Sequence, residues 1–403
     1  PAALETVAER DRGLLQQLCY GTLRHYPRLQ PQLQQLLSKP LKNRDRDIEA
    51  LLLLGLYQLE ETRVPDHAAV AATVAATRAL HKIWAKGLCN AVLRSYLRQR
   101  QQLAGKLSPA AVAAHPQWLF DALQRDWPER ADAIMAANNE QPPMVLRVNR
   151  RLGSREDYLA ALAAADIAAT AGQLAPEAIY LQRAVDVAAL PGFAAGQASV
   201  QDEAAQLAAH LLGARAGERV LDACAAPGGK ACHLLELEPG IALTAMDVDA
   251  SRLQRVRDNL QRLSLQAEVL QGNATAPPAS LQERRFDRIL VDAPCSASGV
   301  IRRHPDVKLL RRADDIATLA AQQLWILQDL WPLLQPGGTL LYVTCSVLEA
   351  ENSAVVQRFL AATGDAELQT LDIPGEIRAH GVQLLPASAG PDGLFFSLLQ
   401  RRH

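Results

Sequence analysis

The first 135 residues carry apolar side chains at the spacing of an α-helix. Leucines recur at Leu14 and Leu18, and the leucine-rich stretch 48–59 and the alanine-rich stretch 67–80 continue the pattern. This pattern predicts an all-helical domain over residues 1–135. Breaks between its helices are expected at the residues that interrupt helices most often, Pro27, Pro31, Pro40, Pro65 and Gly87.

A different pattern follows in residues 136–198. Apolar and polar residues alternate in QPPMVLRVN (141–149), which predicts a strand, and residues 154–165 then have helical spacing. Strand-forming residues return at Ile179–Leu181. These residues therefore predict a small α+β connector.

From residue 199 to residue 403, short apolar strands alternate with helical segments, as in an α/β domain with a parallel sheet. Several of the strands end in Asp, Cys or Gly, and ligands of open α/β sheets bind beyond the carboxyl ends of strands. The expected strands are 219–223, 242–248, 268–271, 288–291, 339–343 and 394–399, and the expected helices are 230–236, 251–263, 315–334 and 352–362.

Composition excludes several classes of protein. With 403 residues, 49% hydrophobic and 21% charged, the chain is expected to fold into two or three globular domains. The apolar run 50–56 is far shorter than the roughly 20 residues of a membrane span, and no signal segment is recognised. The six cysteines form no Cys-x-x-Cys pair and no His cluster has zinc-ligand spacing, so neither a metal site nor a disulfide is expected. We expect a cytoplasmic protein.

The overall charge does not indicate a nucleic-acid partner. Forty-two basic and 43 acidic residues leave a net charge of −1. Local basic runs matter more for phosphate contacts, and three stand out, at 78–100, 147–151 and 302–312. Each run is either a phosphate-binding surface or an ordinary solvated helix face.

Residues 220–230, VLDACAAPGGK, combine a strand, a turn of small residues and the start of a helix. Gly228 and Gly229 allow close approach of a ligand to the backbone, and a helix N-terminus offers free N–H donors. The segment matches neither of the two glycine-rich nucleotide-phosphate motifs. Asp247 ends the next strand, where a carboxylate can accept hydrogen bonds from ribose hydroxyls. The alternative is a plain glycine turn followed by an ordinary aspartate.

Two cysteines are expected beyond strand ends of the same sheet. Asp292 and Cys295 follow one strand in FDRILVDAPCS, and Cys345 follows another in LLYVTCS. A buried structural role is usual for a free cysteine. A thiolate beside a carboxylic acid, however, is suited to covalent attack on an electron-poor ring.

In this order and spacing, DACAAPGGK, DAPCS and TCS resemble the S-adenosylmethionine-dependent RNA cytosine-C5 methyltransferases. The segments GVIRRHPD (299–306), CSVLEAEN (345–352) and DGLFF (392–396) are also similar to that family. The helical N-terminal third resembles a NusB-type RNA-binding domain. The resemblance implies a multi-domain chain, with an all-α NusB-like bundle at 1–135, an α+β RNA-binding connector at 136–198 and a Rossmann-like methyltransferase domain at 199–403.

The resemblance also implies a cofactor, S-adenosyl-L-methionine, and roles for individual residues. Cys345 would be the nucleophile, Cys295 would assist its release, and Asp292 would contact both cofactor and cytosine. Asp247 would hold the ribose. Asn273 stands where the family usually has an aspartate facing the adenine, so cofactor binding is expected to be weaker at most. The methionine part of the cofactor would be held by Cys224, Ala225, Ala226, Pro227, Gly228, Gly229 and Lys230.

The implied reaction is methylation of C5 of a cytosine in small-subunit (16S) ribosomal RNA, through a bond between Cys345 and C6. Asp292, if protonated, would donate a hydrogen bond to ring N3, and the base would have to be unstacked from a loop or a remodelled helix. The enzyme is expected to act as a monomer without metal. Three alternatives remain: another RNA such as tRNA or large-subunit rRNA as substrate, a DNA methyltransferase in which Cys295 attacks, and a non-catalytic assembly factor.

Overall fold

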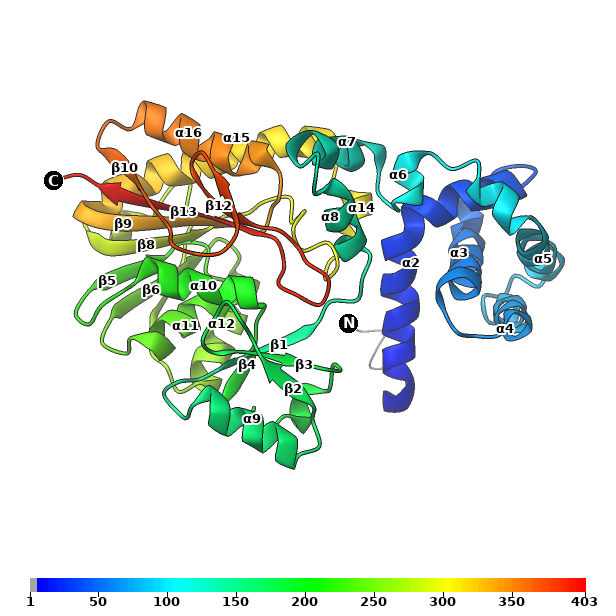
Figure 1. The fold of residues 1–403 in the computed structure, drawn as a ribbon, viewed down its shortest axis with the longest axis horizontal. Helices are drawn as coiled ribbons and strands as arrows, with labels where there is room; N and C mark the ends of the chain where they lie inside the picture. The colour runs from blue at the N-terminus through cyan, green and yellow to red at the C-terminus, as the bar shows by residue number, and fades with distance from the viewer. Residues whose placement is uncertain (1–5) are drawn as a thin grey trace. The chain divides into compact units, whose positions relative to one another are not determined.

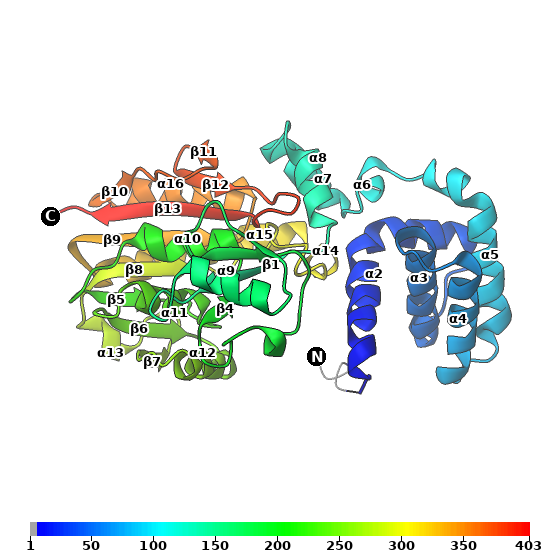
Figure 2. The same cartoon turned by 60° about the horizontal axis from the view of Figure 1, so that its bottom comes forward.

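The computed structural model describes residues 6–403. The chain forms two compact units, one made of residues up to 140 together with 301–311, the other of 141–300 together with 312–403 (Figures 1 and 2). No helix among the described residues has the length and apolar character that a membrane crossing requires. The three-domain division at residues 135 and 198 stays a prediction.

The first unit is helical, as its apolar spacing predicts. Leu52, Leu56, Leu93 and Tyr96 are among the side chains fully removed from solvent in its core. Its helices are α2 (Glu9–Leu36), α3 (Arg46–Glu61), α4 (Asp66–Ala79), α5 (Ala85–Ala104), α6 (Pro109–Val112), α7 (Gln117–Asp126), α8 (Ala131–Asn138) and α14 (Val307–Leu310).

The expected helix breaks at Pro27, Pro31 and Gly87 are wrong, because α2 continues through both prolines and α5 includes Gly87. Each proline removes one backbone hydrogen bond from the helix. A spacing of four puts the two prolines on one side of α2, while Leu29 and Leu33 on another side are buried in the core of the unit. Tertiary packing of this apolar stripe therefore outweighs the tendency of the two prolines to interrupt a helix.

The basic run 302–312 does not lie open to solvent along its length. Lys308 is buried, and its ammonium donates hydrogen bonds to the carbonyl oxygens of Arg24 and Ala114, both at 3.0 Å. Burial, together with the charge of Arg24, lowers the pKa of Lys308 well below its ordinary value. Arg302 is buried too, and its carbonyl accepts a hydrogen bond from Arg24 at 2.8 Å. These side chains attach residues 301–311 to the helical unit instead of forming a phosphate-binding surface.

The second unit begins with a four-stranded antiparallel sheet, in the order β2-β3-β1-β4. The strand 144–148 and the helix 155–164 lie where the sequence predicts them, and Tyr158 and Leu162 of the helix share one core with Leu146 and Val148 of the strand. The elements are β1 (Met144–Val148), α9 (Arg155–Ala164), β2 (Ala169–Ala171), β3 (Ala178–Leu181) and β4 (Ala198–Val200).

A nine-stranded sheet forms the rest of the unit, with the order β11-β12-β13-β9-β8-β5-β6-β7 and β10 beside β13. Strands β5 to β9 pair in parallel, as expected, whereas β10 to β13 form antiparallel pairs, among them the strand predicted at 394–399, so the sheet is mixed. The strands are β5 (Arg219–Asp222), β6 (Ala242–Asp247), β7 (Glu268–Gln271), β8 (Phe286–Asp292), β9 (Leu334–Thr344), β10 (Ala366–Gln369), β11 (Glu376–Arg378), β12 (Gly381–Leu384) and β13 (Leu394–Arg401).

Helices cover both faces of this sheet (Figure 1). Alternate residues of β9 pack into cores on opposite faces of the sheet. Leu341 and Val343 face α10, α11 and α12. Leu340 and Tyr342 face α15 and α16. The three layers explain why the central strands are apolar on both faces. The helices are α10 (Glu203–Leu212), α11 (Gly229–Leu237), α12 (Ala250–Arg262), α13 (Ala279–Gln282), α15 (Ala313–Leu330) and α16 (Ser353–Ala362).

Candidate active site

The predicted site residues gather where the strand order of the sheet reverses. The chain runs outward from β5 through β6 to β7, then returns to β8 on the other side of β5. The carboxyl ends of neighbouring parallel strands at such a point form the usual ligand crevice of an α/β sheet. The turn 223–228, Asp247, Asp292 and Cys345 all follow or end strands at this edge.

The turn between β5 and α11 is shaped to bring backbone close to a ligand. Gly228 has φ +101°, and a Cβ there would lie only 3.1 Å from the Cα of Val256. Side chains of α12 fix the turn from behind: Arg252 donates to the carbonyl oxygen of Ala226 at 2.7 Å, and Asn259 donates to that of Pro227 at 3.0 Å. No side chain caps the first turn of α11, so its amides are available to a ligand.

Asp222, which the sequence analysis left without a role, is a buried carboxylate at the end of β5. It is 1% exposed, and neither oxygen accepts a hydrogen bond from the described residues. Burial, followed by the negative charge of Asp292, raises the pKa of Asp222 to about 7. An unpartnered buried carboxyl group carries a free-energy cost that a cationic ligand would remove.

This shift predicts how stability depends on pH. Folding raises the pKa of Asp222 above the ordinary value of about 4, so the native state keeps a proton that the unfolded chain releases between about pH 4 and pH 7. The wild-type chain should therefore lose stability relative to Asp222→Asn as the pH rises through this window, by up to roughly 4 kcal/mol. Urea unfolding at several pH values measures the difference. A constant difference across the window would contradict the assignment.

Asp247 lies against the same turn. Its Oδ2 accepts a hydrogen bond from the amide of Ala226 at 3.1 Å, and its Oδ1 accepts one from the amide of Asp249 at 3.0 Å. Asn273 follows β7 and is exposed, with its side-chain oxygen accepting bonds from the amide and hydroxyl of Thr275 at 3.0 and 2.9 Å. Asp247 therefore lies at the crevice, while the side-chain oxygen of Asn273 is used locally.

The structure brings Cys295 and Cys345 together, with 3.3 Å between their sulfur atoms. They come from the loops after β8 and β9, which are adjacent parallel strands with Asp292 aligned to Val343. The contact with Cys345, together with burial, raises the pKa of the Cys295 thiol well above its ordinary value. This shift disfavours the thiolate form of Cys295.

An ion pair joins the glycine-rich turn to the loop of the cysteines. The Lys230 ammonium donates a hydrogen bond to Asp292 Oδ2 at 2.6 Å. Burial alone would lower the pKa of Lys230, but the carboxylate of Asp292 raises it, and a thiolate at Cys345 acts in the same direction. Lys230 therefore provides a positive charge within electrostatic range of Cys345.

A buried network that sequence reasoning missed holds the two cysteine loops in place. The carboxylate of Glu351 accepts hydrogen bonds from the amide and hydroxyl of Ser296, at 2.8 and 2.5 Å, and from the hydroxyl of Ser346 at 2.7 Å. These serines directly follow Cys295 and Cys345. The sequence contains one signal of this network, the Cys-Ser pair that occurs in both loops. Two equivalent serines can donate to one buried acceptor, here the carboxylate of Glu351.

Comparisons with known proteins agree with this architecture. A family model described as "16S rRNA methyltransferase RsmB/F" matches residues 209–400, a ferredoxin-like domain model of RsmF/B-like methyltransferases matches 115–188, and a NusB family model matches 2–98. Ribosomal RNA small subunit methyltransferase B of Pseudomonas putida is 53% identical over 403 residues, covering 99% of this chain and 92% of the relative. The chain belongs to the RsmB/F family.

Solved structures place this RsmB/F chain among proteins of the same fold. The crystal structure of PH0851 has a TM-score of 0.84 and 21% identity, covering 98% of this chain and 91% of that one. A methyltransferase homolog protein from Pyrococcus horikoshii has a TM-score of 0.63 and 28% identity, covering 74% and 100% respectively. The predictions of a methyltransferase, of a NusB-like helical domain and of a Rossmann-like catalytic domain are confirmed.

Proposed function

We propose that this RsmB/F chain methylates C5 of a cytosine in 16S ribosomal RNA through a covalent bond between Cys345 and C6 of the base. The observation that carries the proposal is the pair of thiols 3.3 Å apart, beside the carboxylate of Asp292 and the glycine-rich turn. One crevice would thus contain a nucleophile, a second thiol and a carboxyl group.

Cytosine C5 is a poor nucleophile until C6 has been attacked. The thiolate of Cys345 adds to C6, and the electron pair of the C5–C6 double bond moves toward C5, which can then accept a methyl group. Loss of the C5 proton to a base then returns the electrons to the ring, and the C6–sulfur bond breaks to release Cys345. Cys295, directly or through a water molecule, would act in this last stage.

The electrostatics favour Cys345 over Cys295 as the nucleophile. Cys295 keeps its proton because of its contact with Cys345 and its burial, so its S–H can donate to a Cys345 thiolate. Lys230 adds a positive charge that favours the same thiolate. The Lys230 ammonium, 2.6 Å from Asp292 Oδ2, holds this carboxyl group in the crevice, where it would contact the base.

The residues of the crevice fit S-adenosylmethionine, which supplies the methyl group as a sulfonium. The orphaned carboxyl of Asp222 suits a cationic ligand, and the uncapped first turn of α11 offers backbone amides to a carboxylate. Residues 224–230 would bind the methionine part and Asp247 the ribose hydroxyls. Asn273 would contact the adenine. Asp292 would contact the cofactor as well as the cytosine.

The cofactor assignment predicts that Asp247→Ala weakens binding of S-adenosylmethionine. Hydrogen bonds to a charged acceptor contribute roughly 1.5–3 kcal/mol, so we expect affinity to fall about ten- to a hundredfold. Calorimetry on the full chain measures it, with the exposed Asp258→Ala on α12 as a matched control. Unchanged affinity in Asp247→Ala would remove this carboxylate from the site.

The substrate assignment is tested in cells. 5-Methylcytosine should disappear from one position of 16S rRNA when the gene is deleted, and return when the wild-type chain, but not Cys345→Ala, is expressed. Loss of the mark from tRNA or large-subunit rRNA instead would favour the alternative RNA substrate. No change in any RNA would favour the non-catalytic assembly factor.

We propose that the exposed part of the basic run 78–100 in the helical unit contacts the RNA. Lys82 and Arg100 are used inside the unit, the former by Asp45 and Asp47 and the latter by the carbonyl of Glu60. Exposed basic side chains remain on α5, and Trp84, which directly precedes this helix, is 56% exposed and can stack on a base. They are Lys86, Arg94 and Arg98.

Replacing Lys86, Arg94 and Arg98 together by alanine should weaken rRNA binding and leave cofactor affinity unchanged. Each lost phosphate contact should lower the slope of log affinity against log salt by about 0.7–0.9. Filter binding at several salt concentrations measures this, with Lys39 and Arg63, exposed basic residues outside the run, replaced as the control. An equal effect of the control pair would indicate unspecific charge attraction.

A further inference from the structure

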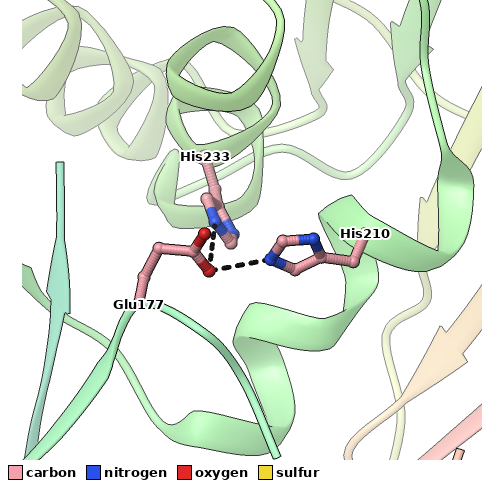
Figure 3. A group of neighbouring side chains, drawn as sticks. All are labelled: Glu177, His210 and His233. Atoms are coloured by element: carbon pink, nitrogen blue, oxygen red, sulfur yellow. Dashed lines mark hydrogen bonds and ion pairs between the residues drawn. The ribbon is translucent and has the colours of Figure 1, made fainter. Parts of the chain in front are cut away.

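Three side chains that can each bind a metal ion meet in the second unit, and none of them comes from the loops that carry Cys295 and Cys345. Glu177 directly precedes β3, His210 lies on the last turn of α10, and His233 lies on α11 (Figure 3). One potential ligand atom from each residue lies within 4.8 Å of the other two. Oε2 of Glu177 is 2.7 Å from Nε2 of His210 and 3.7 Å from Nε2 of His233.

His233 is the residue that needs explanation. Its side chain is 1% exposed, and neither ring nitrogen has a hydrogen-bond partner among the described residues. An unsatisfied buried polar group is rare in folded proteins because it loses its bonds to water without replacement. A neutral imidazole carries a nitrogen lone pair that a ligand can take up.

The donor set has the chemistry of a transition-metal site. Two imidazole nitrogens and one carboxylate oxygen are ligands that Zn²⁺ and its neighbours accept. Bonds of about 2.0–2.2 Å put two ligand atoms of a tetrahedral ion roughly 3.4 Å apart. The distances of 2.7 and 3.7 Å lie on either side of that value, so side-chain shifts of under about 1 Å would complete the geometry.

The surroundings supply access and a partner for the remaining carboxylate oxygen. Oε1 of Glu177 is 3.3 Å from the guanidinium of Arg150, which would orient the carboxylate as outer-shell groups of metal sites do. His210 is partly exposed, and a cavity of about 360 Å³ lined in part by Glu177 and Arg150 opens nearby. An ion and a water ligand therefore have a route to the cluster.

We propose that Glu177, His210 and His233 bind a divalent transition-metal ion of the zinc class, which fastens the segment before β3 to α10 and α11. The bound ion would stabilise α11, the helix that begins at the glycine-rich turn. The site does not depend on the methyl-transfer proposal. Sequence spacing predicts no metal site because the three ligands are 33 and 23 residues apart and belong to no motif.

Zinc titration of the full-length, chelator-treated protein tests the proposal. A competing chromophoric chelator should reveal one tight site in the wild type, and saturating Zn²⁺ should raise the melting temperature by several degrees. His210→Ala and Glu177→Gln should each lower zinc affinity at least tenfold and abolish the rise in melting temperature. These two positions are preferred because His233, deep in the core, could not be replaced without affecting folding.

The controls separate this site from the thiols. His67→Ala, an exposed histidine of the helical unit, should bind zinc as the wild type does. Co²⁺ bound in place of Zn²⁺ should show d–d bands without a thiolate charge-transfer band. The proposal is overturned if the wild type binds no zinc, if affinity is unchanged in His210→Ala and Glu177→Gln, or if the cobalt spectrum shows thiolate ligands.

Discussion

A Cys345→Ala variant should fold normally and lose methylation of rRNA by roughly four orders of magnitude or more, as expected when a covalent nucleophile is removed. The physical reason is that the proposal assigns the attack on C6 to Cys345, while the contact with Cys345 and burial raise the pKa of Cys295 and disfavour its thiolate. Transfer of radiolabelled methyl from S-adenosylmethionine to rRNA measures the rate.

The exposed Cys19 provides a matched control on the helical unit. Cys19→Ala should methylate at the wild-type rate, and thermal unfolding should show that Cys345→Ala retains its fold. Substantial methylation by Cys345→Ala would mean that another group attacks the base.

Loss of the Glu351 carboxylate should have the largest effect on stability. Glu351 is fully buried and accepts bonds from Ser296 and Ser346, and Gln323 donates to it at 3.2 Å. Glu351→Ala would leave these donors unpaired, so we expect a loss of roughly 3–5 kcal/mol in the free energy of unfolding. Urea unfolding measures it.

Two further variants define the role of Glu351. Glu367→Ala, at an exposed position on β10, should change stability by less than about 0.5 kcal/mol. Glu351→Gln keeps the shape and should recover part of the stability, but with a lower kcat at unchanged KM, because one of the two oxygens that accept from the cysteine loops is replaced by an amide donor. If Glu351→Ala is as stable as Glu367→Ala, the network does not hold the loops.

The sequence was sufficient to predict elements whose apolar pattern decides their structure. The parallel strands β5 to β9 lie within a few residues of the predicted positions, apart from the earlier start of β9, because buried parallel strands are continuous apolar runs. The short strands β10 to β12 were missed, since three or four partly polar residues give no period. The break at Pro27 was predicted wrongly because local preference cannot account for packing across a helix bundle.

From the sequence, the site residues could be placed at the ends of strands, but not relative to one another. Cys295 and Cys345 could be placed beyond strands, but their contact depends on β8 and β9 being neighbours, which is a property of the tertiary fold. Asp222 and Glu351 were missed because their importance lies in burial and in their partners or lack of them. Arg147, in one of the three basic runs, fits neither interpretation of them, because it is buried and paired with Glu236 at 2.7 Å.

The division of labour between the two cysteines is the central claim, and a denaturing gel of protein incubated with rRNA and S-adenosylmethionine tests it most directly. Cys345→Ala should show no protein–RNA band, because the bond to C6 cannot form. Cys295→Ala should attack and accept the methyl group but release the RNA poorly. It should therefore accumulate a slow-migrating, RNA-linked band that requires the cofactor, while the wild type shows little of it. An adduct formed by Cys345→Ala and absent from Cys295→Ala would contradict the assignment and make Cys295 the nucleophile.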